Sequence, residues 1–288
     1  MESFFLQIVQ KLVEAQIENP RLEARLMFAE VLHRSPSEIF QDISLTDEEN
    51  KEVEAILEQR LQHKPLDKIL GHREFYKYEF KVSEDVLSPR PDTEILLENA
   101  LEILQSIPNA KILDLGCGSG CIIESLLKDL SFASGCAVDI SDKALVIARE
   151  NADNLALKER MRFVNASWFD TDFVKIVGEK FEMIVSNPPY IPSDDINTLD
   201  REVKEYDPML ALDGGKSGYD SYEQIAKIAP QLLQEGGYVL LEAGIGQAEK
   251  IADIFMLQGF KLLKIANDLS GIARCVILQK AVAENKNS

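Results

Sequence analysis

The spacing of apolar residues predicts that the first part of the chain is helical. Apolar positions recur every three or four residues, as they do along one side of an amphipathic helix. Two such stripes, separated by Asn19-Pro20, are formed by Phe4, Phe5, Ile8, Val9, Leu12 and Val13, and by Leu22, Leu26, Ala29 and Leu32. Thr46-Asp47-Glu48-Glu49 is a capping box that opens a further helix to about Leu61. We expect a helical domain over residues 1–66 that recognises a substrate or partner, because it contains no catalytic constellation.

The hydrophobic pattern changes to strict alternation between residues 74 and 82. The run Glu74-Phe75-Tyr76-Lys77-Tyr78-Glu79-Phe80-Lys81-Val82 is rich in aromatic residues and predicts a β-hairpin. It is followed by Pro89-Arg90-Pro91-Asp92-Thr93-Glu94, which leads into an apolar helix at residues 95–104. We therefore expect a hairpin linker over residues 67–88 and a separate domain over residues 89–288.

Beyond residue 110, strand-like apolar runs alternate with helical stretches, which is typical of a doubly wound α/β sheet. Seven strands are expected, at residues 111–115, 136–140, 162–165, 181–186, 238–243, 260–267 and 274–279. Only a short turn separates the last two, and a short turn cannot form a right-handed parallel crossover. The sequence thus predicts a seven-stranded, mostly parallel sheet that ends in an antiparallel hairpin.

Composition and charge narrow the classes of partner. The 288 residues are 45% hydrophobic and 28% charged, as in an ordinary soluble globular protein, and the formal net charge is −18. Nucleic-acid binding needs clustered Lys and Arg, so we expect no direct nucleic-acid partner. No apolar run reaches the roughly 18 residues of a membrane span. The acidic Glu2 and a short apolar run argue against a signal peptide, so we expect a cytoplasmic protein without membrane contact.

The cysteines and histidines indicate no metal site. Cys117, Cys121, Cys136 and Cys275 fit no zinc-binding spacing, and the three histidines are isolated in the N-terminal third. We expect the cysteines to be free thiols that pack as small apolar residues.

A glycine-rich loop is the first candidate site. Asp114-Leu115-Gly116-Cys117-Gly118-Ser119-Gly120 follows a predicted strand and opens a predicted helix, where backbone N–H groups can meet a ligand. The next predicted strand ends in Asp139, which is placed to accept hydrogen bonds from ribose hydroxyls. Together they predict a nucleoside-cofactor site at Asp139 and at Gly116, Cys117, Gly118, Ser119 and Gly120. The alternatives are a plain turn and, for Asp139, a helix N-cap.

The second candidate site is Asn187-Pro188-Pro189-Tyr190, which follows a predicted strand. In an open α/β sheet, ligands bind beyond the carboxyl ends of the strands, so this segment and the glycine loop should face one crevice. Prolines present carbonyl acceptors without N–H donors, Asn187 adds a side-chain acceptor, and Tyr190 offers a flat face. A planar group that bears an NH2 fits such a set. Asn187, Pro188, Pro189 and Tyr190 are therefore the candidate catalytic and substrate-binding residues, and a surface turn is the alternative.

The chain resembles the HemK family of protein-(glutamine-N5) methyltransferases, which modify peptide chain release factors. The resemblance covers nearly the whole sequence. The helical N-terminal part and Pro89-Arg90-Pro91-Asp92-Thr93-Glu94 are its specific features, whereas the glycine loop and Asn-Pro-Pro-Tyr are shared with other amino methyltransferases. The matching segments also include Ile69-Leu70-Gly71, Glu74-Phe75, Val138-Asp139-Ile140-Ser141, Ala211-Leu212-Asp213-Gly214-Gly215 and residues 271–274.

This resemblance implies a class I methyltransferase fold with S-adenosylmethionine as cofactor. It implies that the glycine loop and Asp139 bind the methionine and ribose end, with Asn187 alongside, and that Trp168 lines the adenine pocket. Residues 187–190 would hold the glutamine amide of the release factor's Gly-Gly-Gln loop, and the helical domain would help to grip the release factor. One residue departs from the family pattern, because Ser167 stands where an acidic residue usually precedes the tryptophan. Trp168 could also be a core aromatic.

Two other functions remain open from the sequence. DNA and RNA bases also present an NH2 on a plane, so a nucleobase amino methyltransferase is the alternative enzyme. Its weakness is the net charge of −18 and the lack of a basic domain. A non-enzymatic adaptor is the third reading, and the intact Asn187–Tyr190 segment argues against it.

Overall fold

The computed structural model describes residues 3–282, and its contacts divide the chain into two compact units. The first is Met1–His72 with Asp200–Tyr206, and the second is Arg73–Leu199 with Asp207–Ser288. The N-terminal Met1-Glu2 and the polar tail at residues 284–288 lie outside the described residues. The domain boundaries expected after residues 66 and 88 remain proposals, because compactness alone does not define an independently folding domain.

The first unit is helical, as its apolar stripes predict. Its elements are α1 (Phe4–Glu14), α2 (Pro20–Leu32), the 3-10 turn η1 (Pro36–Glu38), α3 (Asp47–Arg60), α4 (Leu66–Leu70) and α9 (Arg201–Tyr206). The Thr46 hydroxyl oxygen accepts a hydrogen bond from Glu49 N, and the Glu49 carboxylate accepts one from Thr46 N. The predicted capping box therefore begins α3. The apolar faces meet in a core around Leu12, Phe28 and Leu57.

A charged cluster around the buried Arg60 lies in the helical unit. The Arg60 guanidinium donates from Nε to Glu23 at 2.5 Å and from Nη2 to Glu202 on α9 at 2.7 Å. Its side chain is 2% exposed. Burial raises the pKa of the Glu23 carboxyl, and the hydrogen bond and charge of Arg60 oppose that shift. The cluster holds α9, which is distant in sequence, against α2 and α3.

The second unit begins within the first strand of the predicted hairpin, which is formed by β1 (His72–Phe75) and β2 (Tyr78–Lys81). After it come the 3-10 turn η2 (Pro91–Thr93) and α5 (Glu94–Leu104). Phe75 and Phe80 are buried, and their rings pack edge to face 6.2 Å apart. Their alternation with exposed neighbours is the pattern that indicated the hairpin.

The predicted seven-stranded sheet is confirmed. Its strand order is β5-β4-β3-β6-β7-β9-β8; the first five of these strands pair in parallel, and β9 pairs antiparallel with β7 and with β8. The strands are β3 (Lys111–Leu115), β4 (Ser134–Asp139), β5 (Met161–Asn165), β6 (Phe181–Ser186), β7 (Leu233–Glu242), β8 (Phe260–Asn267) and β9 (Ala273–Lys280).

Several strands begin earlier than the sequence indicates, and β7 differs most. The pattern predicts β7 from Tyr238, but the strand starts at Leu233, which pairs with Phe181 before the register shifts. Gly236 has φ +74° between these two parts. The interruption hides the first residues of the strand, because they do not continue the apolar run that begins at Tyr238.

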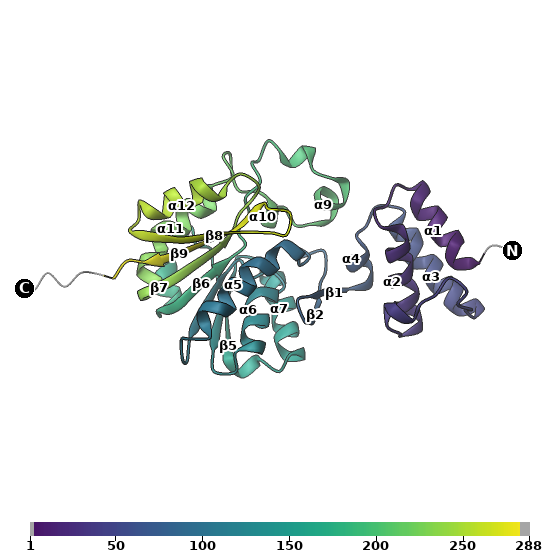
Figure 1. The fold of residues 1–288 in the computed structure, drawn as a ribbon, viewed down its shortest axis with the longest axis horizontal. Coiled ribbons are helices and arrows are strands. Elements are labelled where there is room, and N and C mark those ends of the chain that lie inside the picture. The colour runs from purple at the N-terminus through teal and green to yellow at the C-terminus, as the bar shows by residue number, and fades with distance from the viewer. Residues whose placement is uncertain (1–2, 283–288) are drawn as a thin grey trace, which may run out of the picture. The chain divides into compact units, whose positions relative to one another are not determined.

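Helices cover both faces of the sheet (Figure 1). One apolar layer packs α5, α6 (Cys121–Asp129) and α7 (Asp142–Asn154) on the sheet, and the other packs α8 (Phe173–Val177), α11 (Asp220–Leu232) and α12 (Ala248–Met256). The remaining short elements are η3 (Lys158–Arg160), η4 (Ile196–Thr198) and α10 (Met209–Leu212). The four cysteines are buried and free, as expected. Among the described residues, no helix has both the length and the apolar character of a membrane span.

Candidate functional site

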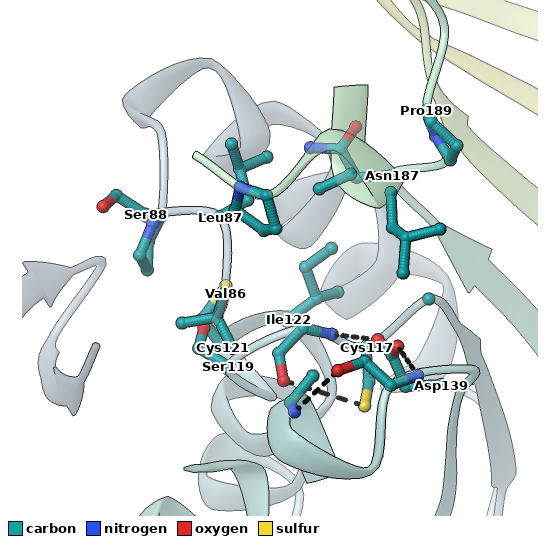
Figure 2. A pocket seen from close by; sticks show the side chains of 18 of the residues that line it. Val86, Leu87, Ser88, Cys117, Ser119, Cys121, Ile122, Asp139, Asn187 and Pro189 are labelled. Atoms are coloured by element: carbon teal, nitrogen blue, oxygen red, sulfur yellow. Dashed lines mark hydrogen bonds between the residues drawn. The ribbon is translucent and has the colours of Figure 1, made fainter. Parts of the chain in front are cut away.

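An open pocket lies at the carboxyl ends of β3, β4 and β6 and encloses about 850 Å³, counting the part open to solvent. In Figure 2, Asn187 and Pro189 lie on one side of it, and Cys117 and Asp139 lie on the opposite side. Gly120, Pro188 and Tyr190 are not part of its lining. The other residues predicted to bind or act on a ligand do line it: Gly116, Cys117, Gly118, Ser119, Asp139, Trp168, Asn187 and Pro189.

The glycine loop is tied to the neighbouring strand at its start and needs glycine at its end. The backbone N–H groups of Gly116 and Cys117 both donate to Val138 O, at 2.9 and 3.0 Å. Gly120 has φ +84° and precedes α6. This positive φ favours glycine, and a Cβ there would also lie 2.1 Å from Glu124 Oε1. These hydrogen bonds therefore anchor the start of the loop, which follows β3, to the end of β4.

Asp139 fixes the other side of the loop. Its Oδ2 accepts from Gly118 N and its Oδ1 from Ser141 N, each at 2.9 Å. Burial raises the pKa of this carboxyl, and its hydrogen bonds from backbone N–H groups oppose the rise. Ser141, whose side chain accepts from Ala144 N, is the N-cap of α7. Each Asp139 oxygen keeps a second lone pair that can accept from a ligand hydroxyl.

Trp168 belongs both to the core and to the pocket. It packs within the apolar layer of α8 and α11 and also lines the pocket. A Cβ at Gly116 would lie 3.3 Å from its ring. The indole Nε1 is buried without a hydrogen-bond partner among the described residues. Ser167, where the family pattern has an acid, accepts a hydrogen bond from Phe169 N and so serves the turn itself.

The Asn187–Tyr190 segment is anchored at both ends. Just before it, Ser186 Oγ donates to Leu115 O at 2.6 Å, which joins the end of β6 to the end of β3. Asn187 Nδ2 donates to Thr93 Oγ1 at 3.5 Å. At the far end, Tyr190 O accepts from Gln247 Nε2 at 3.0 Å. Burial raises the pKa of the Tyr190 phenol to about 12, so it stays protonated near neutral pH.

A returning loop closes over the same segment. Ile191 N donates to Leu212 O at 3.0 Å, and Gly214 N donates to Ile191 O at 2.9 Å. A Cβ at Gly214 would lie 2.7 Å from Tyr190 Cα, so only glycine allows this approach. The backbone therefore leaves the site after Tyr190 and returns to it at Gly214. The hydrogen bonds of Ile191 join the outgoing and returning segments in a narrow neck.

Comparison with known proteins gives matches over nearly the whole chain. Residues 5–71 match the model of the PrmC N-terminal domain, and residues 91–215 match that of the methyltransferase small domain. The release factor glutamine methyltransferase of Rhodospirillum rubrum is 40% identical over 275 residues, which cover 95% of this chain and 83% of the relative. The protein of the same name from Agrobacterium fabrum is 39% identical and covers 94% of both chains. The chain belongs to the release factor glutamine methyltransferase family.

A solved structure agrees with the fold of this family. A 16S rRNA methyltransferase of T. thermophilus, in complex with AdoMet and guanosine, matches with a TM-score of 0.50 at 18% identity. The match covers 73% of this chain and 49% of that chain. At this identity the likeness concerns the fold alone.

As a member of the release factor glutamine methyltransferase family, the chain is an S-adenosylmethionine-dependent methyltransferase. The residues present fit this cofactor, because Asp139 offers free lone pairs beside the loop and Trp168 adds an aromatic wall to the pocket. No group of three or more potential metal-ligating side chains occurs within residues 3–282.

Part of the pocket wall in this family member lacked a chemical signal in the sequence. Residues 85–90 and Thr93 form one side, and Pro208, Leu210 and Ala211 form another. Arg90 joins the two through an ion pair of 2.7 Å with the buried Asp207. Most of these side chains are apolar or small, so the rigid Pro-Arg-Pro spacing was the one available clue.

Two buried carboxyls beneath the glycine loop were not foreseen as unusual. Both oxygens of Asp114 and both of Glu124 lack partners within residues 3–282. Burial and the nearby Asp139 charge raise the pKa of Asp114 to about 8. Burial raises the pKa of Glu124, and Asp114 adds to the shift. The Asp114 carboxyl is therefore largely protonated at neutral pH, which avoids placing a further full charge under the loop.

Proposed function

We propose that the chain transfers a methyl group to the side-chain amide nitrogen of the glutamine in the Gly-Gly-Gln loop of peptide chain release factors. The observation that carries this proposal is that Asn187 lines the same pocket as the glycine loop and Asp139. The names of relatives that are 39–40% identical support glutamine in a release factor as the substrate. The alternative, a nucleobase substrate, would need a basic surface that the net charge of −18 does not favour.

In this proposal, the glycine loop and Asp139 hold S-adenosylmethionine. Asp139 accepts from the ribose hydroxyls with the lone pairs that its two backbone hydrogen bonds leave free. Residues 116–120 follow the methionine end, and Trp168 borders the adenine. Asn187 borders the cofactor on the substrate side. When bound, the cofactor supplies a methyl group carried on a positively charged sulfur.

The Asn187–Tyr190 segment orients the substrate amide. Asn187 Oδ1 and the Pro188 carbonyl accept the two amide N–H groups, Pro189 helps to keep the backbone extended, and Tyr190 packs on the plane of the amide. The amide nitrogen is a poor nucleophile because its lone pair is delocalised. Two accepted hydrogen bonds raise its electron density and fix its direction of approach, so the residues act through orientation and preorganised electrostatics. The nitrogen gains the methyl group and releases one proton to solvent.

The remaining parts of the chain serve recognition. Residues 1–66 grip the release factor, and the enzyme works in the cytoplasm without binding nucleic acid directly. The acidic surface can attract a basic face of the release factor, which would make the association rate fall as salt is added. An association rate that is insensitive to ionic strength would remove this steering role and leave the transfer reaction unaffected.

The test is incubation of the purified enzyme with methyl-labelled S-adenosylmethionine and a purified release factor, followed by peptide mapping. We expect one methyl group on the glutamine of the Gly-Gly-Gln peptide. A release factor whose glutamine is changed to alanine is the matched control, and single-stranded oligonucleotides test the alternative substrate. Transfer to the oligonucleotides but not to the release factor would overturn the proposal.

A further inference from the structure

A buried carboxyl next to Asn187 has no place in the mechanism above. Glu242 is the last residue of β7, and 3% of its surface is exposed. It does not line the pocket, and its Oε2 has no hydrogen-bond partner within residues 3–282. Burying a carboxyl in this way is unfavourable unless its neighbours compensate, so its surroundings indicate what it does.

Two polar side chains of the pocket lie against this carboxyl. Ser186 pairs with Leu241 where β6 and β7 run in parallel, so Asn187 follows next to Glu242. Hydrogen bonding by Thr93 and Asn187 lowers the pKa of Glu242 and so favours its charged form. Asn187 Nδ2 also donates to Thr93 Oγ1. Since Thr93 Oγ1 accepts from Asn187, its own proton is free for Glu242. The hydrogen bonds therefore run in one direction, from the Asn187 amide group toward the carboxylate.

This direction decides which way the Asn187 carboxamide is turned. An ionised carboxylate can only accept, so the NH2 end of the carboxamide must face Glu242 and Thr93. The opposite orientation would set Asn187 Oδ1 against the oxygens of both residues and leave an NH2 group as the available end. We propose that Glu242, acting with Thr93, is a positioning residue that keeps Asn187 Oδ1 available to accept from the substrate NH2. This role rests on the proposed function of Asn187.

The loop that follows Glu242 holds the other end of the same segment. Gln247 Nε2 donates to Tyr190 O at 3.0 Å, and Gln247 Oε1 accepts from Gly244 N at 3.2 Å. A Cβ at Gly244 would lie 3.0 Å from Tyr190 Cδ2, so these two segments pack together without space for a side chain at position 244. Residues 242–247 thus fasten both ends of Asn187–Tyr190, which is the arrangement that a rigid substrate clamp needs.

Positioning requires the ionised form of Glu242. A protonated carboxyl could donate to Asn187 Oδ1 and so permit the wrong orientation. Burial and the charge of Asp92 raise the pKa, whereas Thr93, Arg274 and Asn187 lower it, and the balance is about 7. The other titratable groups that feel its charge are Tyr190, Tyr222, Cys121 and Cys275. With release factor as substrate, we therefore expect kcat to fall about tenfold from pH 8 to pH 6, as one group titrates.

Variants of Glu242 test this role in the full-length enzyme. Glu242→Met fills a similar volume but cannot accept, so kcat should fall at least about tenfold at pH 8, while the Kd for S-adenosylmethionine stays within about twofold. Glu242→Gln resembles the protonated acid, because it can donate to Asn187 Oδ1 and does not titrate, so it should lower kcat at pH 8 and lose the further decrease toward pH 6. Leu240→Ala, a core change on the same strand, controls for loss of stability and should leave kcat within about twofold at a temperature where it is folded.

The Thr93 link gives a second, conservative pair. Thr93→Ser keeps the hydroxyl and should keep the wild-type pH profile. Thr93→Val keeps the shape of the side chain but loses the hydroxyl and should lower kcat. Cofactor binding measured by calorimetry shows that each variant is folded. Wild-type kcat and pH profile in both Glu242 variants would overturn the positioning role alone. Absence of release factor methylation by the wild-type enzyme would instead overturn the proposed function.

Discussion

Trp168 packs so closely on Gly116 that a Cβ at this glycine would lie 3.3 Å from indole Cη2. Gly116 also has φ +75°, a backbone conformation that residues other than glycine rarely adopt. The position of the Trp168 ring in the pocket wall therefore depends on the absence of a side chain at Gly116. A change at either residue should alter the space for the cofactor.

Replacement of this glycine should weaken cofactor binding. In Gly116→Ala, the backbone strain should lower the free energy of unfolding by about 1–2 kcal/mol, and the displaced ring should raise the Kd for S-adenosylmethionine about tenfold. Gly259→Ala is a matched control, because Gly259 has φ +85° with no atom within 4 Å of a Cβ. The control should lose similar stability and keep its affinity. Equal Kd values for the two variants would contradict the packing argument.

Asn187→Ala should separate cofactor binding from transfer. Loss of the side-chain acceptor removes an interaction that strengthens as the amide nitrogen reacts, so we expect kcat to fall by on the order of 100-fold or more. The Kd for S-adenosylmethionine should change only a few-fold. Single-turnover transfer of labelled methyl groups measures the first effect and calorimetry the second. Asn99→Ala on α5 is the control, and equal rates for both variants would exclude the role of Asn187.

Asp114 should make the stability of the protein decrease as the pH rises. Its pKa is raised from an ordinary 3.8 to about 8 by burial and by Asp139. Its contribution to stability is therefore fully present below pH 3.8 and is lost as the pH rises through about 8. Between these values the slope for one such group approaches about 1.4 kcal/mol per pH unit.

Asp114→Asn should remove this slope. Relative to the wild type, the variant should be more stable at pH 9 than at pH 5, as measured by urea unfolding at both values. The exposed Asp253 on α12 supplies the control Asp253→Asn, for which the difference from wild type should not depend on pH. A parallel pH dependence of wild type and Asp114→Asn would show that this carboxyl does not titrate as described.

Removing Arg60 should destabilise the helical unit. Arg60→Met would leave the half-buried Glu23 beside Glu202 and Asp67 without its cation, which should lower the free energy of unfolding by about 1–3 kcal/mol. Hydrogen exchange should then show weaker protection in α2, α3 and α9, whereas β3 and β4 should keep theirs. Arg25→Met on the exposed side of α2 is the control. Unchanged protection in α9 would mean that the charged cluster does not hold this helix.

The sheet and the two motifs were predictable because their signals are local. Buried parallel strands read as continuous apolar runs, as in residues 111–115 and 181–186, and all seven strands occur where such runs lie. Parallel strands place their carboxyl ends together. The glycine loop, Asp139 and Asn187 could therefore be expected to meet, although their roles remain proposals.

What the sequence did not indicate depends on contacts between distant positions. Glu242 reads as an ordinary acid at the end of a strand, and only folding places it against Thr93 and Asn187. The start of β7 was hidden because the polar residues and glycines at positions 234–237 interrupt the apolar pattern. Likewise, nothing in residues 200–206 marks them as partners of Arg60, because ion pairing carries no periodicity that a sequence pattern could reveal.

The membership of residues 200–206 in the helical unit has a consequence for exchange of parts between relatives. The neck formed by Ile191 and Gly214 opens a loop whose middle, α9, belongs with α2 and α3. A chimera that joined the first 72 residues of one relative to the remainder of another would combine an α9 from one lineage with an Arg60 environment from the other. The helical unit can therefore be transplanted intact only as two separate stretches of chain, which must change together.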